Sequence, residues 1–322
     1  MLTAIVGINW GDEGKGRMVD LLSSEYDIIC RYQGGNNAGH TVINDKGKFV
    51  LNLLPSGILR ETTVNVMGNG MVIDIEHLAG EIKNLTDKGI KITPENLKIS
   101  DKAIVCLPYH MKKGIRMEDL LHLDSIYEKV CDLVQWKNIT VTGYGHEPIN
   151  PDDIMDWLNT YGPQAAQYVT DVSTYLYDAA KSGRNIMFEA QLGALRDIDF
   201  GIYPYTSSSQ TLAAFGPIGA GIPGVKLDNA IGIMKAYSTC VGEGPFTVEM
   251  FGDEAEQLRA AGGEYGAATG RPRRVGAFDV PASKYGVRVQ GADEIALTKL
   301  DVLGYMDKIP VCTAYEVDGE RT

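Results

Sequence analysis

The chain has 322 residues, of which 44% are hydrophobic and 22% are charged, and its formal net charge is -12 at pH 7. This composition is typical of a globular protein with a large core, and the acidic balance argues against nucleic acid or an anionic membrane as a partner. The five cysteines form no CxxC pair, and no apolar stretch is long enough to cross a bilayer or to act as a signal peptide, so we expect reduced thiols and a cytoplasmic location.

Short apolar runs alternate with longer helical patterns along the chain. Strands are predicted at residues 4–8, 28–31, 64–67, 186–188 and 231–234, and helices at 75–85 and 169–180. Strands that alternate with helices predict an α/β fold with a mostly parallel central sheet flanked by helices. Because no linker divides the chain, we expect one domain over residues 1–322. The last residues, 311–322, predict a hairpin whose second strand has barely begun, which indicates truncation at the C-terminus.

The first predicted strand runs into a glycine-rich turn, residues 10–16, which is followed by a helix. Glycines permit the sharp turn, the N–H groups of the helix point at an anion, and Lys15 adds a positive charge. The pattern predicts a phosphate-binding turn similar to that of P-loop NTPases. A single glycine-rich turn is also common in α/β proteins that bind no phosphate, so it carries limited weight alone.

Two carboxylates, Asp12 and Glu13, stand in the middle of this turn. They repel a phosphate unless a cation or a chemical task offsets that cost. We therefore interpret Asp12 as a catalytic or metal-binding group.

A second glycine-rich turn, residues 34–41, contains His40, which we expect to titrate near neutral pH. A lone histidine is more often a hydrogen-bonded structural residue than an acid or base. The closeness of the two turns in the sequence nevertheless predicts that they form one active site.

Local positive charge is concentrated at Arg271, Arg273 and Arg274 in an otherwise acidic chain. Guanidinium groups hold carboxylates in paired hydrogen bonds, so this cluster predicts a site for a small anionic substrate. The alternative is a solvated surface turn.

Four motifs, at residues 10–16, 37–41, 269–274 and 298–301, stand in the order found in adenylosuccinate synthetase, and the chain resembles that family over nearly its whole length. The similarity includes the stretches 53–59 and 235–239. The resemblance implies a homodimeric ligase of AMP biosynthesis that joins L-aspartate to IMP with GTP and Mg²⁺. The products are adenylosuccinate, GDP and phosphate.

The resemblance also implies roles for individual residues. Asp12 takes the proton from N1 of IMP and ligates Mg²⁺ with the Gly39 carbonyl, while His40 contacts the transferring phosphoryl group. Lys299 and Asp301 read guanine, although residues 298–301 also resemble a helix start. The implied GTP-binding residues are Glu13, Gly14, Lys15, Gly16, Arg17, Gly39, His40, Thr41, Lys299 and Asp301. The implied IMP-binding residues are Asp12, Asn37, Gln191, Ser207 and Arg271, and those for aspartate are Val241, Thr269, Arg271 and Arg273.

The sequence departs from the family pattern at two places. Relatives read Glu-Gly-Ala-Gln-Gly where residues 189–193 read Glu-Ala-Gln-Leu-Gly, so Gln191 is displaced by one position. After Tyr109 and His110 the chain lacks a segment that carries an IMP-binding arginine in relatives. A real deletion predicts weak IMP binding.

These departures leave two alternatives open: a guanine-nucleotide-binding regulator without catalysis, and a ligase for another purine monophosphate. The retained Asp12, His40, Arg271 and Arg273 favour the adenylosuccinate-forming enzyme.

Overall fold

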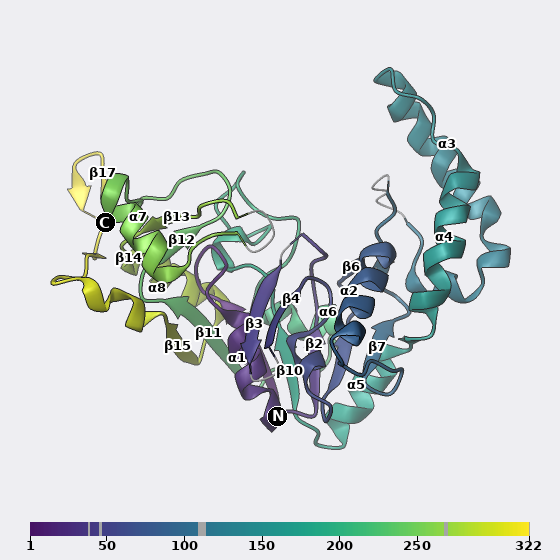
Figure 1. The fold of residues 1–322 in the computed structure, drawn as a ribbon, viewed down its shortest axis with the longest axis horizontal. Coiled ribbons are helices and arrows are strands. Elements are labelled where there is room, and N and C mark those ends of the chain that lie inside the picture. Colours follow the sequence, from purple (N-terminus) through teal and green to yellow (C-terminus); the bar gives the residue numbers. More distant parts are fainter. Residues whose placement is uncertain (38, 45–46, 109–113, 267–269, 322) are drawn as a thin grey trace.

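The computed structural model describes residues 1–37, 39–44, 47–108, 114–266 and 270–321. Within them lies an eight-stranded sheet whose neighbouring strands all pair in parallel, in the order β15-β11-β1-β10-β2-β5-β7-β9 (Figure 1). The strands are β15 (Glu294–Thr298), β11 (Asn229–Lys235), β1 (Leu2–Gly7), β10 (Ile186–Glu189), β2 (Ile28–Arg31), β5 (Val64–Met67), β7 (Leu97–Ser100) and β9 (Val169–Thr170). The predicted α/β fold with a parallel central sheet is confirmed.

Helices cover both faces of this sheet, and successive strand residues point to opposite faces. Ile5, Ile29 and Met187 pack in one cluster with Val19 of α1 (Lys15–Leu22). A second cluster on the other face joins strand residues to helices α5 (Val172–Lys181) and α6 (Gly216–Ala220). Because both faces of β1, β2 and β10 are buried, these central strands are almost continuously apolar.

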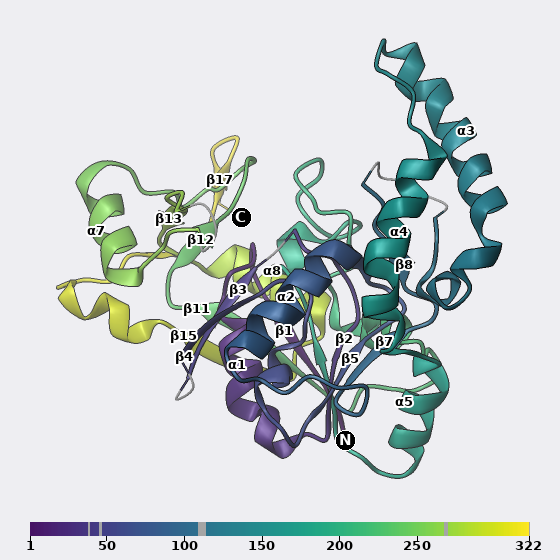
Figure 2. The same cartoon turned by 45° about the vertical axis from the view of Figure 1, so that its right-hand side comes forward.

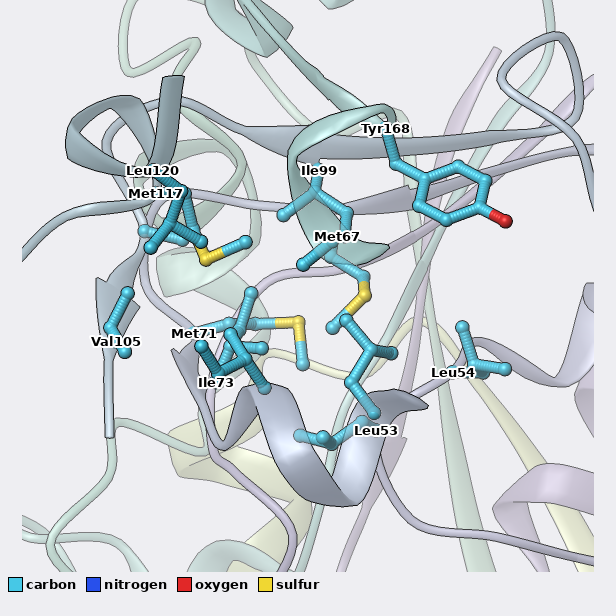
Figure 3. Close-up of a cluster of buried hydrophobic side chains, with 14 of the residues drawn as sticks. Leu53, Leu54, Met67, Met71, Ile73, Ile99, Val105, Met117, Leu120 and Tyr168 are labelled. Atoms are coloured by element: carbon cyan, nitrogen blue, oxygen red, sulfur yellow. The ribbon is translucent and has the colours of Figure 1, made fainter. Parts of the chain in front are cut away.

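The largest hydrophobic cluster lies at the β5–β7 side of the sheet (Figure 3). Leu53, Met67, Ile99 and Met117 pack there with residues of α2 (Ile75–Asp87), α3 (Tyr127–Gly143) and α4 (Pro151–Ala166). Helix α3 extends beyond α4, away from the sheet (Figures 1 and 2).

Smaller elements complete the fold around the sheet. The remaining strands are β3 (His40–Asn44), β4 (Gly47–Leu51), β6 (Val72–Ile73), β8 (Ile104–Val105), β12 (Ser238–Cys240), β13 (Arg274–Gly276), β14 (Phe278–Asp279), β16 (Val311–Cys312), β17 (Glu316–Val317) and β18 (Glu320–Arg321). The other helices are α7 (Gly252–Gly262) and α8 (Val280–Gln290), and short 3₁₀ helices span Ser23–Glu25, Ser56–Leu59, Met117–Leu121, Leu123–Ser125, Ala194–Arg196, Ala213–Phe215 and Leu300–Tyr305. Across the described ranges, no helix combines the length and the apolar character that crossing a membrane requires.

Several predicted elements differ from the structure by one or two residues at an end, as 4–8 does from Leu2–Gly7, and the largest difference lies at one helix start. Val169 and Thr170 form strand β9, and α5 begins only at Val172 because the Asp171 side chain caps it by accepting from the Thr174 N–H at 3.0 Å. The predicted terminal hairpin is present, since β17 and β18 pair across Asp318 and Gly319, which have φ of 52° and 84°.

Candidate active site

Three of the central strands have a charged residue as their last residue, at the carboxyl end of the strand. Arg31 ends β2, Glu189 ends β10 and Lys235 ends β11, and their exposed fractions are 0%, 3% and 4%. In open α/β sheets, ligands bind outside the carboxyl ends of the strands, where the strand order reverses. In this sheet the reversal occurs at β1, which lies between β10 and β11. In the sequence each of these residues follows an apolar run, but that pattern alone predicts no role for Arg31, Glu189 or Lys235.

The turn after β1 has the backbone that a phosphate-binding turn needs. Gly11, Asp12 and Gly14 have positive φ, at 103°, 60° and 97°. Aspartate is one of the few residues with a side chain that tolerates this conformation. Gly14 is the N-cap of α1 and has no side chain to occupy the N–H groups of the first turn, so these groups are available to an anion.

The Glu13 side chain faces inward and braces the turn. Its Oε1 accepts from the backbone N–H groups of Asn9 at 3.1 Å and Gly11 at 2.9 Å, and its Oε2 lies 2.7 Å from the Lys15 ammonium. A Cβ on Gly7 would lie 2.5 Å from Glu13 Oε2, so the end of β1 must be glycine to admit this pair. The cation that offsets Glu13 is therefore Lys15.

Asp12 forms an ion pair with a residue of the predicted arginine cluster. Its Oδ2 lies 3.0 Å from Nε of Arg273, whose Nη1 lies 2.9 Å from Oε2 of Glu264. The other oxygen of Glu264 accepts from the Lys235 ammonium at 2.8 Å and from the Tyr237 hydroxyl. The structure thus brings the carboxylate of the first turn and the arginine loop into one chain of ion pairs.

Burial affects the pKa values of Lys235 and Glu264 in this series of ion pairs. Burial lowers the pKa of Lys235, although Glu264 acts in the opposite sense. Burial opposes ionisation of Glu264 too, but its contacts with Lys235, Tyr237 and Arg273 outweigh that effect and lower its pKa. The Glu264 carboxylate is therefore held in its charged form.

His40 lies against the first turn of α1. A Cβ on Gly16 would come within 2.3 Å of Cδ2 of the imidazole and 3.2 Å of its Nε2. The Nε2 atom is 2.8 Å from the Ser56 hydroxyl, which donates to Glu189 at 2.7 Å. The two glycine-rich turns therefore meet, with His40 over the start of the helix.

The expectation that His40 titrates near neutral pH is wrong. Burial, reinforced by the positive charges of Arg31 and Lys15, lowers the pKa of His40 to about 3. The imidazole is neutral at physiological pH, and what it offers there is a hydrogen bond.

The predicted guanine reader lies next to the phosphate turn. Thr298 ends β15 and its hydroxyl donates to the Glu13 carbonyl at 2.8 Å. Lys299 has a φ of 63° and donates to the Gly262 carbonyl at 2.8 Å, while Asp301 is exposed. The motif also begins the 3₁₀ helix Leu300–Tyr305, so the alternative reading as a helix start describes its local structure correctly.

Two arginines fix the turn that contains Val241. Arg196 donates to the Val241 carbonyl at 2.6 Å, and Arg274 donates to the Gly244 carbonyl at 2.9 Å while pairing with Glu249. The Val241 side chain itself is 54% exposed. Arg274 is thus occupied within the fold, in contrast to Arg273, which reaches the phosphate turn.

The remaining predicted residues lie around this centre or outside the described chain. Gln191 is buried, and its amide donates to the Gly35 carbonyl at 2.9 Å, so it supports the second turn from within. Ser207 bonds to its own turn through Ser209. Thr41 pairs with Val50 in the β3–β4 hairpin, and Arg17, Asn37 and Arg271 are exposed. Thr269 and the junction at 109–113 lie outside the described residues.

A family model described as adenylosuccinate synthetase matches residues 4–113 and 111–322 of the chain. The chain belongs to the adenylosuccinate synthetase family. It is 42% identical to adenylosuccinate synthetase of Clostridium novyi (strain NT) and 43% identical to that of Limosilactobacillus fermentum, and each alignment covers 98% of this chain and 81% of the relative. The predicted family and the predicted ligase class are confirmed.

The alignment with the Clostridium novyi protein spans 347 positions, more than the 322 residues of this chain. That relative therefore carries residues, within the aligned region, that this chain lacks. The two segments matched by the family model meet at residues 111–113, where the sequence analysis places the missing segment.

Solved structures agree with this assignment. The structure of fully ligated adenylosuccinate synthetase from Plasmodium falciparum superposes with a TM-score of 0.88 at 32% identity, covering 99% of this chain and 82% of that one. A cyanophage S-2L succinoaminodeoxyadenylate synthetase, bound to dGMP and dATP, superposes with a TM-score of 0.62 at 21% identity, which shows a shared fold alone.

The position of His40 over Gly16 predicts the outcome of Gly16→Ala. The residue is helical, so alanine favours the helix by about 0.5–1 kcal/mol, but its Cβ displaces the imidazole. We expect the melting temperature to be unchanged or raised while phosphate release from GTP falls at least tenfold, by about 1.4 kcal/mol in the barrier. Gly80→Ala, on α2 where a Cβ meets nothing within 4 Å, is the matched control. Full activity of Gly16→Ala would contradict this placement of His40.

The lowered pKa of His40 predicts how stability depends on pH. In the unfolded chain His40 binds a proton below about pH 6.5, whereas in the folded chain it stays neutral down to about pH 3. The free energy of unfolding is therefore at its full value above pH 6.5 and decreases as the pH falls below that value. Between pH 7 and 5, this residue contributes a slope of at most about 1.4 kcal/mol per pH unit to the free energy of unfolding. Urea unfolding should show that the difference in the free energy of unfolding between wild type and His40→Asn becomes smaller as the pH is lowered to 5. Parallel pH profiles would contradict the shift.

Proposed function

We propose that the chain catalyses the GTP-dependent ligation of L-aspartate to IMP through a 6-phosphoryl-IMP intermediate, giving adenylosuccinate, GDP and phosphate. The observation that carries this proposal is the 3.0 Å ion pair between Asp12 and Arg273. A protein that only binds guanine nucleotide needs neither a carboxylate base in its phosphate turn nor an arginine clamp beside it. An enzyme that must activate a purine oxygen and then admit an amino acid needs both at one place.

The first chemical step converts the 6-oxygen of IMP into a leaving group. In our proposal Asp12 removes the proton from N1, the 6-oxygen attacks the γ-phosphorus of GTP, and the bond to the GDP oxygen breaks. The N–H groups of the first turn of α1 and the Lys15 ammonium hold the phosphates. Neutral His40 donates a hydrogen bond to the transferring group, whose charge increases in the transition state.

The second step places the amino group of aspartate on C6. Its nitrogen attacks C6, phosphate leaves with the 6-oxygen, and the proton lost by the nitrogen passes to the released phosphate. We assign Arg271 and Arg273 to the aspartate carboxylates, and we assign Val241 and Thr269 to further contacts with aspartate. Since Arg273 already pairs with a carboxylate in this structure, its guanidinium lies in a position where a substrate carboxylate can compete with Asp12.

Asp301 is our proposed reader of guanine, with Lys299 beside it. A carboxylate accepts from the N1–H and the amino group of guanine, and adenine offers no such pair of donors. Asn37, Gln191, Ser207 and Arg271 are the proposed IMP contacts. The segment that this chain lacks predicts that IMP binds weakly.

Mg²⁺ belongs to the proposal as well. Magnesium favours oxygen ligands, keeps several waters and is usually held by one or two carboxylates plus phosphates. The Asp12 carboxylate and the Gly39 carbonyl match this donor set, and the described part of the chain contains no group of three or more His, Cys, Asp or Glu side chains placed to hold a metal ion. The ion would neutralise charge on the GTP phosphates when bound.

A coupled assay with IMP, GTP and L-aspartate tests the function through Asp12→Asn. Asparagine tolerates the positive φ at this position but cannot take a proton, so we expect adenylosuccinate formation to fall at least 100-fold with the fold intact. Asp119→Asn removes a carboxylate that pairs with Lys129 on the surface, and it should leave the rate unchanged.

The outcomes of the same assay separate the alternatives. Phosphate release that ignores L-aspartate would favour a nucleotide-binding regulator, and a product formed from dGMP but not from IMP would favour a ligase for another purine. ATP should not replace GTP. Substantial activity in Asp12→Asn would reject the role of Asp12.

We also propose a homodimer in the cytoplasm, on the basis of family membership. Large apolar side chains on the projecting α3, at Trp136 and Ile139, are 66% and 72% exposed, and a second copy is the occupant we assign to them. Light scattering should give twice the 35.0 kDa chain mass. Trp136→Asp should shift the protein towards the monomer, whereas Tyr177→Asp on α5 should not. A monomeric wild type would reject the dimer.

A further inference from the structure

Behind His40 lies a buried pair of residues to which the sequence assigned no role. Ser56 begins a 3₁₀ helix, Glu189 ends β10, and both are almost completely buried. The Ser56 backbone N–H donates to Glu189 Oε2 at 2.8 Å and its hydroxyl donates to Oε1 at 2.7 Å. One carboxylate therefore fixes both the position and the direction of the Ser56 hydroxyl.

The direction of this hydroxyl determines where His40 carries its proton. A serine hydroxyl has one hydrogen, and the one on Ser56 is directed to Glu189. Its oxygen, 2.8 Å from His40 Nε2, can then only accept, so Nε2 must be the protonated nitrogen of the neutral ring. Glu189 Oε1 is itself 3.4 Å from Nε2 and favours the same tautomer.

The charges around Glu189 maintain this order of hydrogen bonds. Burial raises the pKa of Glu189, and the Arg31 guanidinium, the two Ser56 donors and the Lys15 ammonium act against that effect. Arg31 ends the neighbouring strand β2 and is fully buried, so its charge requires a nearby carboxylate. A protonated Glu189 would donate to the Ser56 hydroxyl, which would then donate to His40 Nε2 and leave the proton of the neutral ring on Nδ1.

We propose that Ser56 and Glu189 are positioning residues that hold His40 in the Nε2–H tautomer over the first turn of α1, ready to donate to a phosphoryl group. This inference rests on the proposed role of His40. The same edge of the ring faces both Ser56 and Gly16. A phosphate bound at the helix start can therefore replace Ser56 as the acceptor of the Nε2–H hydrogen bond. His40 thereby stabilises developing negative charge as a neutral ring, without having to carry a positive charge.

Nitrogen-15 NMR of the full chain with labelled histidine tests the tautomer without any need for activity. The His40 resonances are assigned by their loss in His40→Asn. We expect a protonated Nε2 and a bare Nδ1 in the wild type, and we expect the Nε2 resonance to move in Ser56→Ala while the other histidines keep theirs. A wild-type Nδ1–H tautomer, or a His40 signal unaffected by Ser56→Ala, would overturn the inference.

Kinetics test the positioning role. Groups that orient a functional side chain typically contribute about 10- to 100-fold. We expect such a loss of kcat in Ser56→Ala and in Glu189→Gln, with the KM for GTP within about twofold of wild type. Ser100 lies on β7 and its buried hydroxyl donates to Asn69. Ser100→Ala is the matched control and should keep the wild-type kcat.

If Ser56→Ala keeps a kcat within twofold of wild type, the positioning role is rejected while the proposed function stands. If the wild type shows no ligase activity, the proposed function fails, and the tautomer measurement alone decides whether Ser56 and Glu189 orient His40. A Glu189→Gln variant that does not fold leaves the decision to Ser56→Ala.

Discussion

The active-site edge of this protein depends on buried charges that must be paired. Removing an ion from water costs several kcal/mol even after the protein relaxes, and a nearby opposite charge with good hydrogen bonds offsets that cost. Glu13 pairs with Lys15, and Glu264 pairs with both Lys235 and Arg273. These pairs hold the strand ends and the first glycine-rich turn together, and Arg273, which pairs with Glu264, also reaches Asp12.

The consequence appears most clearly in the phosphate turn. Two adjacent carboxylates there have opposite orientations, since Glu13 turns inward and braces the backbone while Asp12, at a positive φ, reaches Arg273. A single cation, Lys15, neutralises the inward carboxylate. The outward carboxylate is left to interact with groups that a substrate can replace.

The charged strand ends and the two glycine-rich turns belong to the part of the fold shared with a solved enzyme of the family. The superposition on the Plasmodium falciparum enzyme, with a TM-score of 0.88, covers 99% of this chain. It includes the strands that end with Arg31, Glu189 and Lys235, and the two glycine-rich turns. The two segments that the family model matches meet at residues 111–113, and the aligned Clostridium novyi protein carries residues that this chain lacks.

The sequence alone determined the family and the parallel α/β fold, because apolar strands, glycine spacing and four ordered motifs are local features of the chain. Strands 28–31 and 64–67 were predicted with the bounds that the structure has. Local patterns could not show which charged side chains pair, since Asp12 with Arg273, and His40 with Ser56 and Glu189, meet only when distant strands become neighbours. For the same reason the ionisation of His40 was misjudged: its pKa depends on burial and on the charges of Arg31 and Lys15, which only the tertiary structure places beside it.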